Sequence, residues 1–213
     1  MKLVRRLILF ISLTVIILSL TGTTDLPKLS LAREEAKNFF TGLAGENKQI
    51  LVVKIDDTNA AHPQIGVEDA DLVYVEQVEG GLTRLAAIYT SKLPPLIGPI
   101  RSARISDIEL LAQFGRVGFA YSGAQSKMRP VIAEANLENL SAERNPPSIY
   151  GKDPNRVGPV DMILKPDLLL ERANANPKIR IETATASVFA FGDAPKGETN
   201  TGNPETAAHK PHI

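Results

Sequence analysis

The sequence predicts an α/β domain: a mixed sheet with a central β-hairpin, and helices covering both faces. Three observations lead to this prediction. Apolar runs of strand length alternate along the chain with segments of helical pattern. Two of these runs flank a Glu-Gly-Gly turn, which is typical of a hairpin. Both faces of that hairpin are largely apolar, which indicates interior strands covered on both sides.

The N-terminal segment has the pattern of a secretory signal. The first six residues carry three positive charges, and the 14 residues from Leu7 to Leu20 carry none. This run is shorter than the about 20 apolar residues of a stable membrane span. We therefore expect residues 1–22 to be a signal peptide or a signal anchor, with the rest of the chain outside the cytoplasm.

The end of this segment resembles a lipoprotein signal without its lipid acceptor. Leu20, Thr21 and Gly22 match the Leu-x-Gly triplet that precedes a lipidated Cys, but Thr23 stands at the Cys position. A thioether to lipid cannot form on Thr. The chain is then either cleaved and released or held by an uncleaved anchor, and the lack of a small-x-small cleavage site favours the anchor.

The next elements lead from a linker into the hairpin. Residues 23–48 read as a linker with one short helix, capped by Ser30 and ended by glycines. Residues 50–55 read as a buried strand, and residues 72–78 and 82–89 as the hairpin strands. With Gly80 and Gly81 as the two loop residues, Glu76 would face Leu85.

The remaining elements alternate between helix and strand. A helix that starts near Ser102 or Ser106 runs to about Phe114, with capping-box spacing from Ser106 to Glu109 and with Gly115 just past its end. The further expectations are a strand at 117–121, a helix from Pro130 to about 136, an irregular stretch at 137–160, a helix at 167–173 and a strand at 182–191. The domain would thus span residues 49–191, and residues 192–213 would form a flexible tail.

Composition excludes several functional classes. The chain has 213 residues, with 24 basic and 24 acidic side chains, three His and no Cys. Zero net charge argues against a nonspecific nucleic-acid binder. The lack of Cys excludes disulfides, iron–sulfur clusters and thiol catalysis, and so few His disfavour a zinc site. No nucleotide-binding fingerprint occurs. We therefore predict no cofactor, no metal and no nucleic-acid partner.

Two arginines stand just before a predicted helix. The helix macrodipole disfavours Arg101 and Arg104 there by about 0.3–1 kcal/mol each. Negative charge must offset this cost, either from the chain or from a bound anion. Glu76, Glu79 and Asp107 are the carboxylates that could pair with them. Two interpretations stay open: an Arg–Glu network that locks the hairpin to the loop, and an anion or glycan site.

Two further features supply candidate ligand-binding residues. Glu76 lies among apolar neighbours, so it is paired with an Arg, or carries a raised pKa as a candidate acid or base, or sits at a wet strand end. Asp56 and Asn59 follow a strand, a position where α/β sheets bind ligands. The candidate set contains Glu76, Glu79, Arg84, Arg101, Ser102, Arg104, Asp56 and Asn59.

Five short motifs together resemble the YerB-like family of bacterial lipoprotein-like proteins. They are Asp56-Asp57, Pro63-Gln64, Ala70 to Tyr74, Glu79 to Arg84, and Gly98 to Arg104. The resemblance covers roughly residues 49–175. It implies the N-terminal α/β domain of that family, which is a domain of unknown function, and it implies no specific activity.

The chain departs from the family pattern in several places. The lipidated Cys is absent, and Asp57 replaces an Asn. The family tends to have Arg-x-x-Pro-His-Asn, whereas Arg156-Val-Gly-Pro159 is followed here by Val160, so any catalytic role of that His would be lost. Family members also usually continue into a smaller β-rich domain, which we expect to be missing here.

These inferences predict an exported protein of the bacterial cell envelope, tethered to the cytoplasmic membrane by its N-terminal segment or secreted. The leading hypothesis is a module that binds an anionic ligand, a cell-wall glycan or an envelope protein through Arg84, Arg101 and Arg104. An alternative is a hydrolase of a glycan or phosphodiester, with Glu76 or Glu79 as acid or base. A third class is a scaffold without a small ligand. An open polar cleft beside Glu79 and Arg101 would favour binding or hydrolysis.

Overall fold

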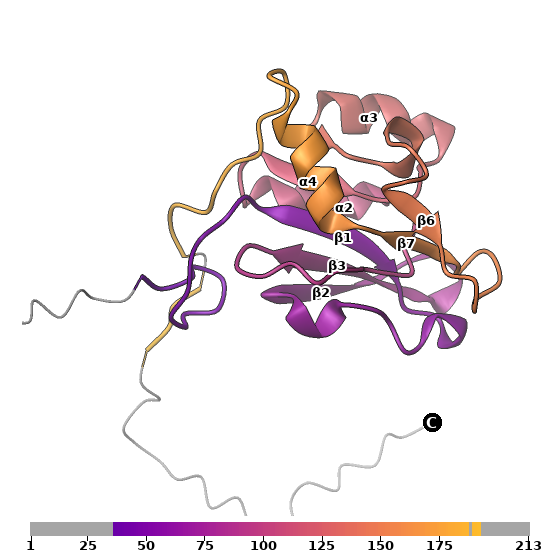
Figure 1. Ribbon diagram of the computed structural model, residues 1–213, viewed down its shortest axis with the longest axis horizontal. Helices are drawn as coiled ribbons and strands as arrows, with labels where there is room; N and C mark the ends of the chain where they lie inside the picture. The colour runs from indigo at the N-terminus through magenta and orange to yellow at the C-terminus, as the bar shows by residue number, and fades with distance from the viewer. Residues whose placement is uncertain (1–35, 188, 193–213) are drawn as a thin grey trace, which may run out of the picture. The chain divides into compact units, whose positions relative to one another are not determined.

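The computed structural model describes residues 36–187 and 189–192 (Figure 1). The signal segment, Thr23 and the predicted helix cap at Ser30 lie outside the described residues. Among the residues that are described, none of the helices has the length and apolar character needed to cross a membrane.

The domain is built on a five-stranded mixed sheet with the strand order β2-β3-β1-β4-β5. Figure 1 shows β2, β3 and β1 side by side in this sheet. β1, β4 and β5 are parallel, whereas β3 runs antiparallel to both β1 and β2. The carboxyl ends of the three parallel strands and the hairpin loop therefore lie at one edge of the sheet. The strands are β1 (Leu51–Asp56), β2 (Leu72–Gln77), β3 (Thr83–Tyr89), β4 (Val117–Ala120) and β5 (Leu137–Asn139).

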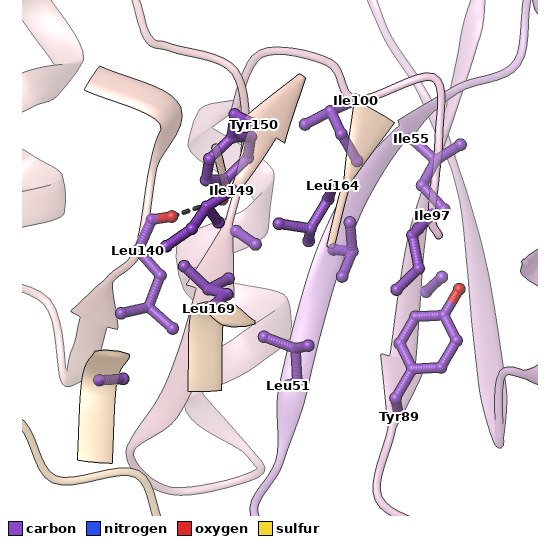
Figure 2. Close-up of a cluster of buried hydrophobic side chains, with 14 of the residues drawn as sticks. Leu51, Ile55, Tyr89, Ile97, Ile100, Leu140, Ile149, Tyr150, Leu164 and Leu169 are labelled. Atoms are coloured by element: carbon purple, nitrogen blue, oxygen red, sulfur yellow. Dashed lines mark hydrogen bonds between the residues drawn. The ribbon is translucent and has the colours of Figure 1, made fainter. Parts of the chain in front are cut away.

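Helices cover both faces of this sheet, so the predicted α/β class is confirmed. One face packs against α4 (Pro166–Asn174) and a two-stranded sheet of β6 (Tyr150–Lys152) and β7 (Met162–Leu164). Leu51 and Ile55 of β1 lie in this layer with Leu164 and Leu169, all fully buried (Figure 2). Full burial of such a side chain contributes about 1.5–3 kcal/mol.

The opposite face packs against α2 (Ile105–Ala112) and α3 (Arg129–Glu134). Val52 and Ile88 of the sheet contribute to this second core with Leu111 of α2 and Ile132 of α3. Because successive residues of a strand point to opposite faces, β1 supplies both cores from one continuous apolar run. Lys54 is a charged residue within that run, and its fully buried side chain lies on the α2 face.

The hairpin pairs in a register one residue away from the predicted one. Glu76 faces Arg84, not Leu85. The loop has three residues, Glu79–Gly81, rather than two, and both of its glycines have positive φ, 74° and 71°. The extra loop residue shifts the pairing and moves side chains of one strand to the other face relative to the prediction. Glu76 and Arg84 thereby come to share the face that α2 covers.

β3 is an interior strand as predicted, but β2 forms an edge of the sheet. Val75 of β2 is correspondingly exposed. The expectation that both hairpin strands are interior was therefore wrong for β2. An apolar pattern shows that a side chain suits a pleated surface, but it does not show whether another strand pairs alongside.

Two expectations for the C-terminal half were also wrong. The stretch at 137–160, predicted to be irregular, contains β5 and β6. The strand predicted at 182–191 is reduced, within the described residues, to one isolated bridge between Thr183 and Gln49. Phe189 and Phe191 are exposed, so the alternating apolar pattern there does not mark a paired strand. The helices of this half lie close to their predicted positions.

The described part of the predicted linker, residues 36–48, contacts the α2 face of the sheet. Phe40 is buried against Phe114, with ring centroids 5.2 Å apart. The side-chain amide of Asn38 donates a 2.9 Å hydrogen bond to Thr90 Oγ1, next to β3. These residues form turns and one bridge between Lys37 and Ala44, and no helix is present among them.

Candidate functional site

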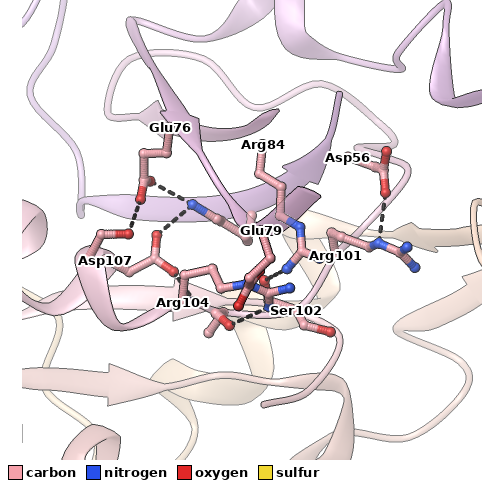
Figure 3. A network of polar contacts seen from close by, with 11 residues as sticks. Asp56, Glu76, Glu79, Arg84, Arg101, Ser102, Arg104 and Asp107 are labelled. Atoms are coloured by element: carbon pink, nitrogen blue, oxygen red, sulfur yellow. Dashed lines mark hydrogen bonds and ion pairs between the residues drawn. The ribbon is translucent and has the colours of Figure 1, made fainter. Parts of the chain in front are cut away.

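The candidate residues gather at the sheet edge where β1 ends and β3 begins (Figure 3). Asp56 is the last residue of β1, and Arg84 lies directly opposite it in β3. The loop that carries the two helix-proximal arginines is held at this edge because the Arg101 N–H donates a 2.8 Å hydrogen bond to the Lys54 carbonyl. Ligands of α/β sheets bind at this kind of edge, outside the carboxyl ends of the parallel strands.

Glu76 does not pair with an arginine. Its Oε1 lies 2.5 Å from Lys54 Nζ, which in turn lies 2.7 Å from Asp107 Oδ1. Lys54 and Asp107 are fully buried, and Glu76 is nearly so. Ser106 of α2 donates a 2.7 Å hydrogen bond to Glu76 Oε2. The buried ammonium group of Lys54 thus forms ion pairs with both Glu76 and Asp107. An unpaired buried charge at any of these positions would cost several kcal/mol.

The pKa values of Glu76 and Asp107 are shifted in opposite directions. Burial pushes the pKa of Glu76 upward, but the hydrogen bond and charge of Lys54 outweigh that effect and leave the pKa below its ordinary value. Burial raises the pKa of Asp107 to about 6 despite the nearby Lys54. Asp107 is the more deeply buried of the two, and desolvation therefore dominates there. Two of the three alternatives for Glu76, the wet strand end and the raised pKa, were therefore wrong, and the partner in the third is Lys54 instead of the predicted Arg.

Asp107 also sets the start of α2. Its Oδ2 accepts a 2.6 Å hydrogen bond from the Arg104 N–H, so the first turn begins after Arg104. The carboxylate in this first turn offsets the macrodipole that disfavours the arginines. The predicted capping pair of Ser106 and Glu109 was wrong, because the hydroxyl of Ser106 bonds to Glu76 instead.

Arg84 lacks a carboxylate partner among the described residues. Its Nη1 donates a 2.7 Å hydrogen bond to the Ser102 carbonyl, and its side chain is 9% exposed. Burial, and then the charges of Arg104 and Arg101, lower the pKa of Arg84 to about 10. Glu76 lies opposite Arg84 in the hairpin, but Lys54 holds the Glu76 carboxylate. Arg84 therefore has no ion pair among the described residues, and Asp56 and Glu79 offset its charge only through longer-range attraction.

The other two arginines have carboxylate partners. Arg101 Nε lies 2.7 Å from Asp56 Oδ2, and Arg104 Nε lies 2.8 Å from Glu79 Oε2 (Figure 3). Glu79 is 66% exposed, so solvent screens its ion pair with Arg104 and the pair is weak. A backbone hydrogen bond and then the hydrogen bond from Arg104 lower the pKa of Glu79.

Arg101 also borders a hollow on the surface. The hollow has a volume of about 780 Å³, within the range of small-molecule sites. Arg101 Nη1 donates a 3.2 Å hydrogen bond to the Pro159 carbonyl at its rim. The other lining residues are Thr58, Ala60, His62, Asp153, Asn155, Arg156, Val157, Gly158 and Val160. Arg101 is thus the one candidate residue shared by the arginine cluster and this hollow.

The structure brings most candidate residues together. Arg104 pairs with Glu79, one of its predicted partners, whereas Arg101 pairs with Asp56, which was not among them. Glu79, Arg84, Arg101, Ser102 and Arg104 share one edge with Asp56, whereas Asn59 is exposed in a short 3-10 turn (Asn59–Ala61). Lys54 was missed. A lysine within the apolar run of β1 was the available signal, because a buried lysine requires a carboxylate partner.

Three comparisons relate this chain to known proteins. A family model described as "Protein of unknown function (DUF3048) N-terminal domain" matches residues 40–180. The chain is 40% identical over 68 residues to "Putative lipoprotein YerB" of Bacillus subtilis (strain 168), a match that covers 30% of this chain and 20% of that protein. The crystal structure of the YerB protein from Bacillus subtilis matches with a TM-score of 0.61 and 26% identity.

The structural match covers 70% of this chain and 53% of the solved chain. The matched region therefore spans about half of the solved relative. The resemblance stated from the sequence motifs is confirmed by the family model, by the curated relative and by the solved structure.

Proposed function

Because this chain belongs to the family defined by the DUF3048 N-terminal domain, we propose that it acts outside the cytoplasm as a membrane-tethered module that binds an anionic envelope component. The bound group is the anion of a cell-wall glycan, of a phosphorylated polymer or of a partner protein. The lipoprotein name of the Bacillus relative and the signal-like segment of this chain support the location.

The observation that carries the proposal is that Arg84 has no ion pair among the described residues and donates its one hydrogen bond there to the Ser102 carbonyl. An arginine that is mostly buried, with its pKa lowered by burial and by two neighbouring arginines, gains most from an added anion. Arg101 and Arg104 flank it and have their carboxylates engaged. An incoming phosphate or carboxylate would accept hydrogen bonds from donors that the chain itself leaves free.

The hollow beside Arg101 supports binding over a purely structural network. If ion pairs filled all the space around the arginines, no ligand could enter. Arg101 instead borders a hollow of about 780 Å³. The hydrolase alternative receives no such support. A general acid needs a carboxyl group that keeps its proton near neutral pH, and the pKa values of Glu76 and Glu79 are both lowered.

The test is a ligand screen on wild type and on Arg84→Gln, with inorganic phosphate and soluble cell-wall glycan fragments as probes. Thermal shift would report binding, and denaturant melts would report stability. We expect Arg84→Gln to keep the free energy of unfolding within about 1 kcal/mol of wild type, since it removes an unpaired charge. We also expect it to weaken binding at least tenfold.

Lys165→Gln is the matched control, because Lys165 is exposed and lies at the start of α4, away from the cluster. It should leave binding unchanged. If no probe binds wild type and Arg84→Gln is strongly destabilised, the arginine cluster is a scaffold and the binding proposal fails.

A further inference from the structure

A second hollow lies between β5 and the end of α4. Its volume is about 690 Å³, which is within the range of small-molecule sites. Three cations line it: Arg144 from the 3-10 turn after β5 (Ala142–Arg144), Arg172 from α4, and Lys178 from the segment after α4. None of them belongs to the arginine cluster described above.

These three cations have no ion pair and no side-chain hydrogen bond with the described part of the chain, in contrast to most arginines of the domain. Arg101, Arg104, Arg116, Arg129 and Arg156 are each paired with a carboxylate. The one carboxylate that lines the hollow, Glu138, is already engaged. Its Oε1 accepts hydrogen bonds from Arg116 Nε at 2.8 Å and from the Arg180 N–H at 3.0 Å.

The macrodipole of α4 does not account for the whole group. It favours a cation such as Arg172 in the last turn. It does not explain Arg144, which comes from a different element more than twenty residues earlier in the chain. Three uncompensated charges around one hollow raise the local potential in a chain whose net charge is zero.

The lining also offers neutral hydrogen-bonding groups in fixed positions. Asn145 Nδ2 donates a 2.9 Å hydrogen bond to the Ser141 carbonyl, and Asn176 Oδ1 accepts a 3.1 Å bond from the Lys178 N–H. The Asn176 contact holds the segment that carries Lys178. Leu140, Ala173 and Ile179 supply the apolar part of the lining.

From this arrangement we propose a second anion site, separate from the arginine cluster, that takes a ligand with two or more phosphate groups. Two guanidinium groups and one ammonium match several phosphate oxygens at once, with the arginines as bidentate donors and the lysine as a point charge. A single phosphate would engage only part of this set.

The experiment is calorimetric titration of the full-length protein in nonionic detergent, with inorganic tripolyphosphate and with orthophosphate as probes. We expect tripolyphosphate to bind wild type at least tenfold more tightly than orthophosphate. Arg144→Gln, Arg172→Gln and Lys178→Gln should each weaken tripolyphosphate binding about threefold to tenfold. The triple variant should abolish the tripolyphosphate binding of this hollow, and any binding that remains should depend on Arg84.

A matched triple control removes the same charge elsewhere: Lys37→Gln, Lys127→Gln and Lys165→Gln, all at exposed positions. This control should keep the wild-type affinity for tripolyphosphate. The proposal is overturned if tripolyphosphate does not bind, if it binds no more tightly than orthophosphate, or if the control loses as much affinity as the site variant. Loss of tripolyphosphate binding in Arg84→Gln alone would place that binding in the arginine cluster and would also overturn this second site.

Discussion

At the scale of single residues, the positions of three charges decide what the candidate site can do. Lys54 lies in β1, whose six residues are all buried, and pairs with Glu76, the carboxylate that faces Arg84 across the hairpin. Arg84 is then left with a backbone carbonyl as its partner. Arg84 thus lacks an ion pair among the described residues because a buried lysine in the neighbouring strand β1 holds the Glu76 carboxylate.

Removal of the buried cation should strongly destabilise the fold. Lys54→Met leaves Glu76 and Asp107 close together and unpaired. We expect a loss of about 3–5 kcal/mol in the free energy of unfolding, measured by denaturant melts. The triple variant with Lys54→Met, Glu76→Gln and Asp107→Asn should recover much of this loss, because no buried charge remains. A Lys54→Met protein as stable as wild type would contradict the assigned role of Lys54.

Asp107 should make stability depend on pH. Its pKa is raised from 3.8 to about 6 in the folded state, so between these values the folded protein binds more protons than the unfolded chain. The contribution of Asp107 to stability therefore falls as pH rises from about 4 to 6. Glu76 acts in the opposite sense at lower pH, because its lowered pKa gives stability that is lost as the folded carboxylate is protonated.

The measurement is a series of denaturant melts from pH 4 to 7 on wild type and Asp107→Asn. Asparagine keeps an oxygen that can accept the hydrogen bond from the Arg104 N–H. Relative to wild type, the variant should gain stability as pH rises through this window, on the order of 1–3 kcal/mol in total. A difference that does not change with pH would show that Asp107 does not titrate there.

At the scale of elements, local patterns located most helices and strands close to where they lie. The strand at 50–55 and the helix starting near Pro130 are one residue away from β1 and α3 at their first residues. The hairpin was recognised from its glycines, but its register was not. Two-residue and three-residue loops both use glycines with positive φ, and only the pairing in the folded sheet distinguishes them.

The three-residue loop should depend on glycine because of backbone conformation alone. Gly81 has φ of 71°, and an added Cβ would meet no atom within 4 Å. We expect Gly81→Ala to cost about 1 kcal/mol, and Gly81→Asn to cost less, since asparagine tolerates the left-handed region. Denaturant melts would measure both. Gly45→Ala is the control at ordinary φ, with 3.7 Å to the nearest atom, and it should be close to neutral.

At the scale of the whole molecule, the proposed location rests on the N-terminal segment and the binding proposal on the folded domain. A reporter that is active only outside the cytoplasm, fused after Ile213, should give signal if the positive N-terminal flank stays inside. A fusion without residues 1–22 is the control and should be inactive. Activity of a cytoplasmic reporter at the same position would refute the proposed location.

The sequence by itself determined the α/β class, the positions of most elements, the family and the residues that meet at the sheet edge. Apolar periodicity, turn glycines and short motifs act over a few neighbouring residues, so they can be read along the chain. Only the tertiary structure decided the hairpin register, the edge position of β2, the pairing of Lys54 with Glu76 and Asp107, and the cations around the second hollow. Ion pairs form between side chains that are close in the folded chain, whatever their separation in sequence. One added loop residue or one buried lysine therefore changes which charged side chains pair with one another.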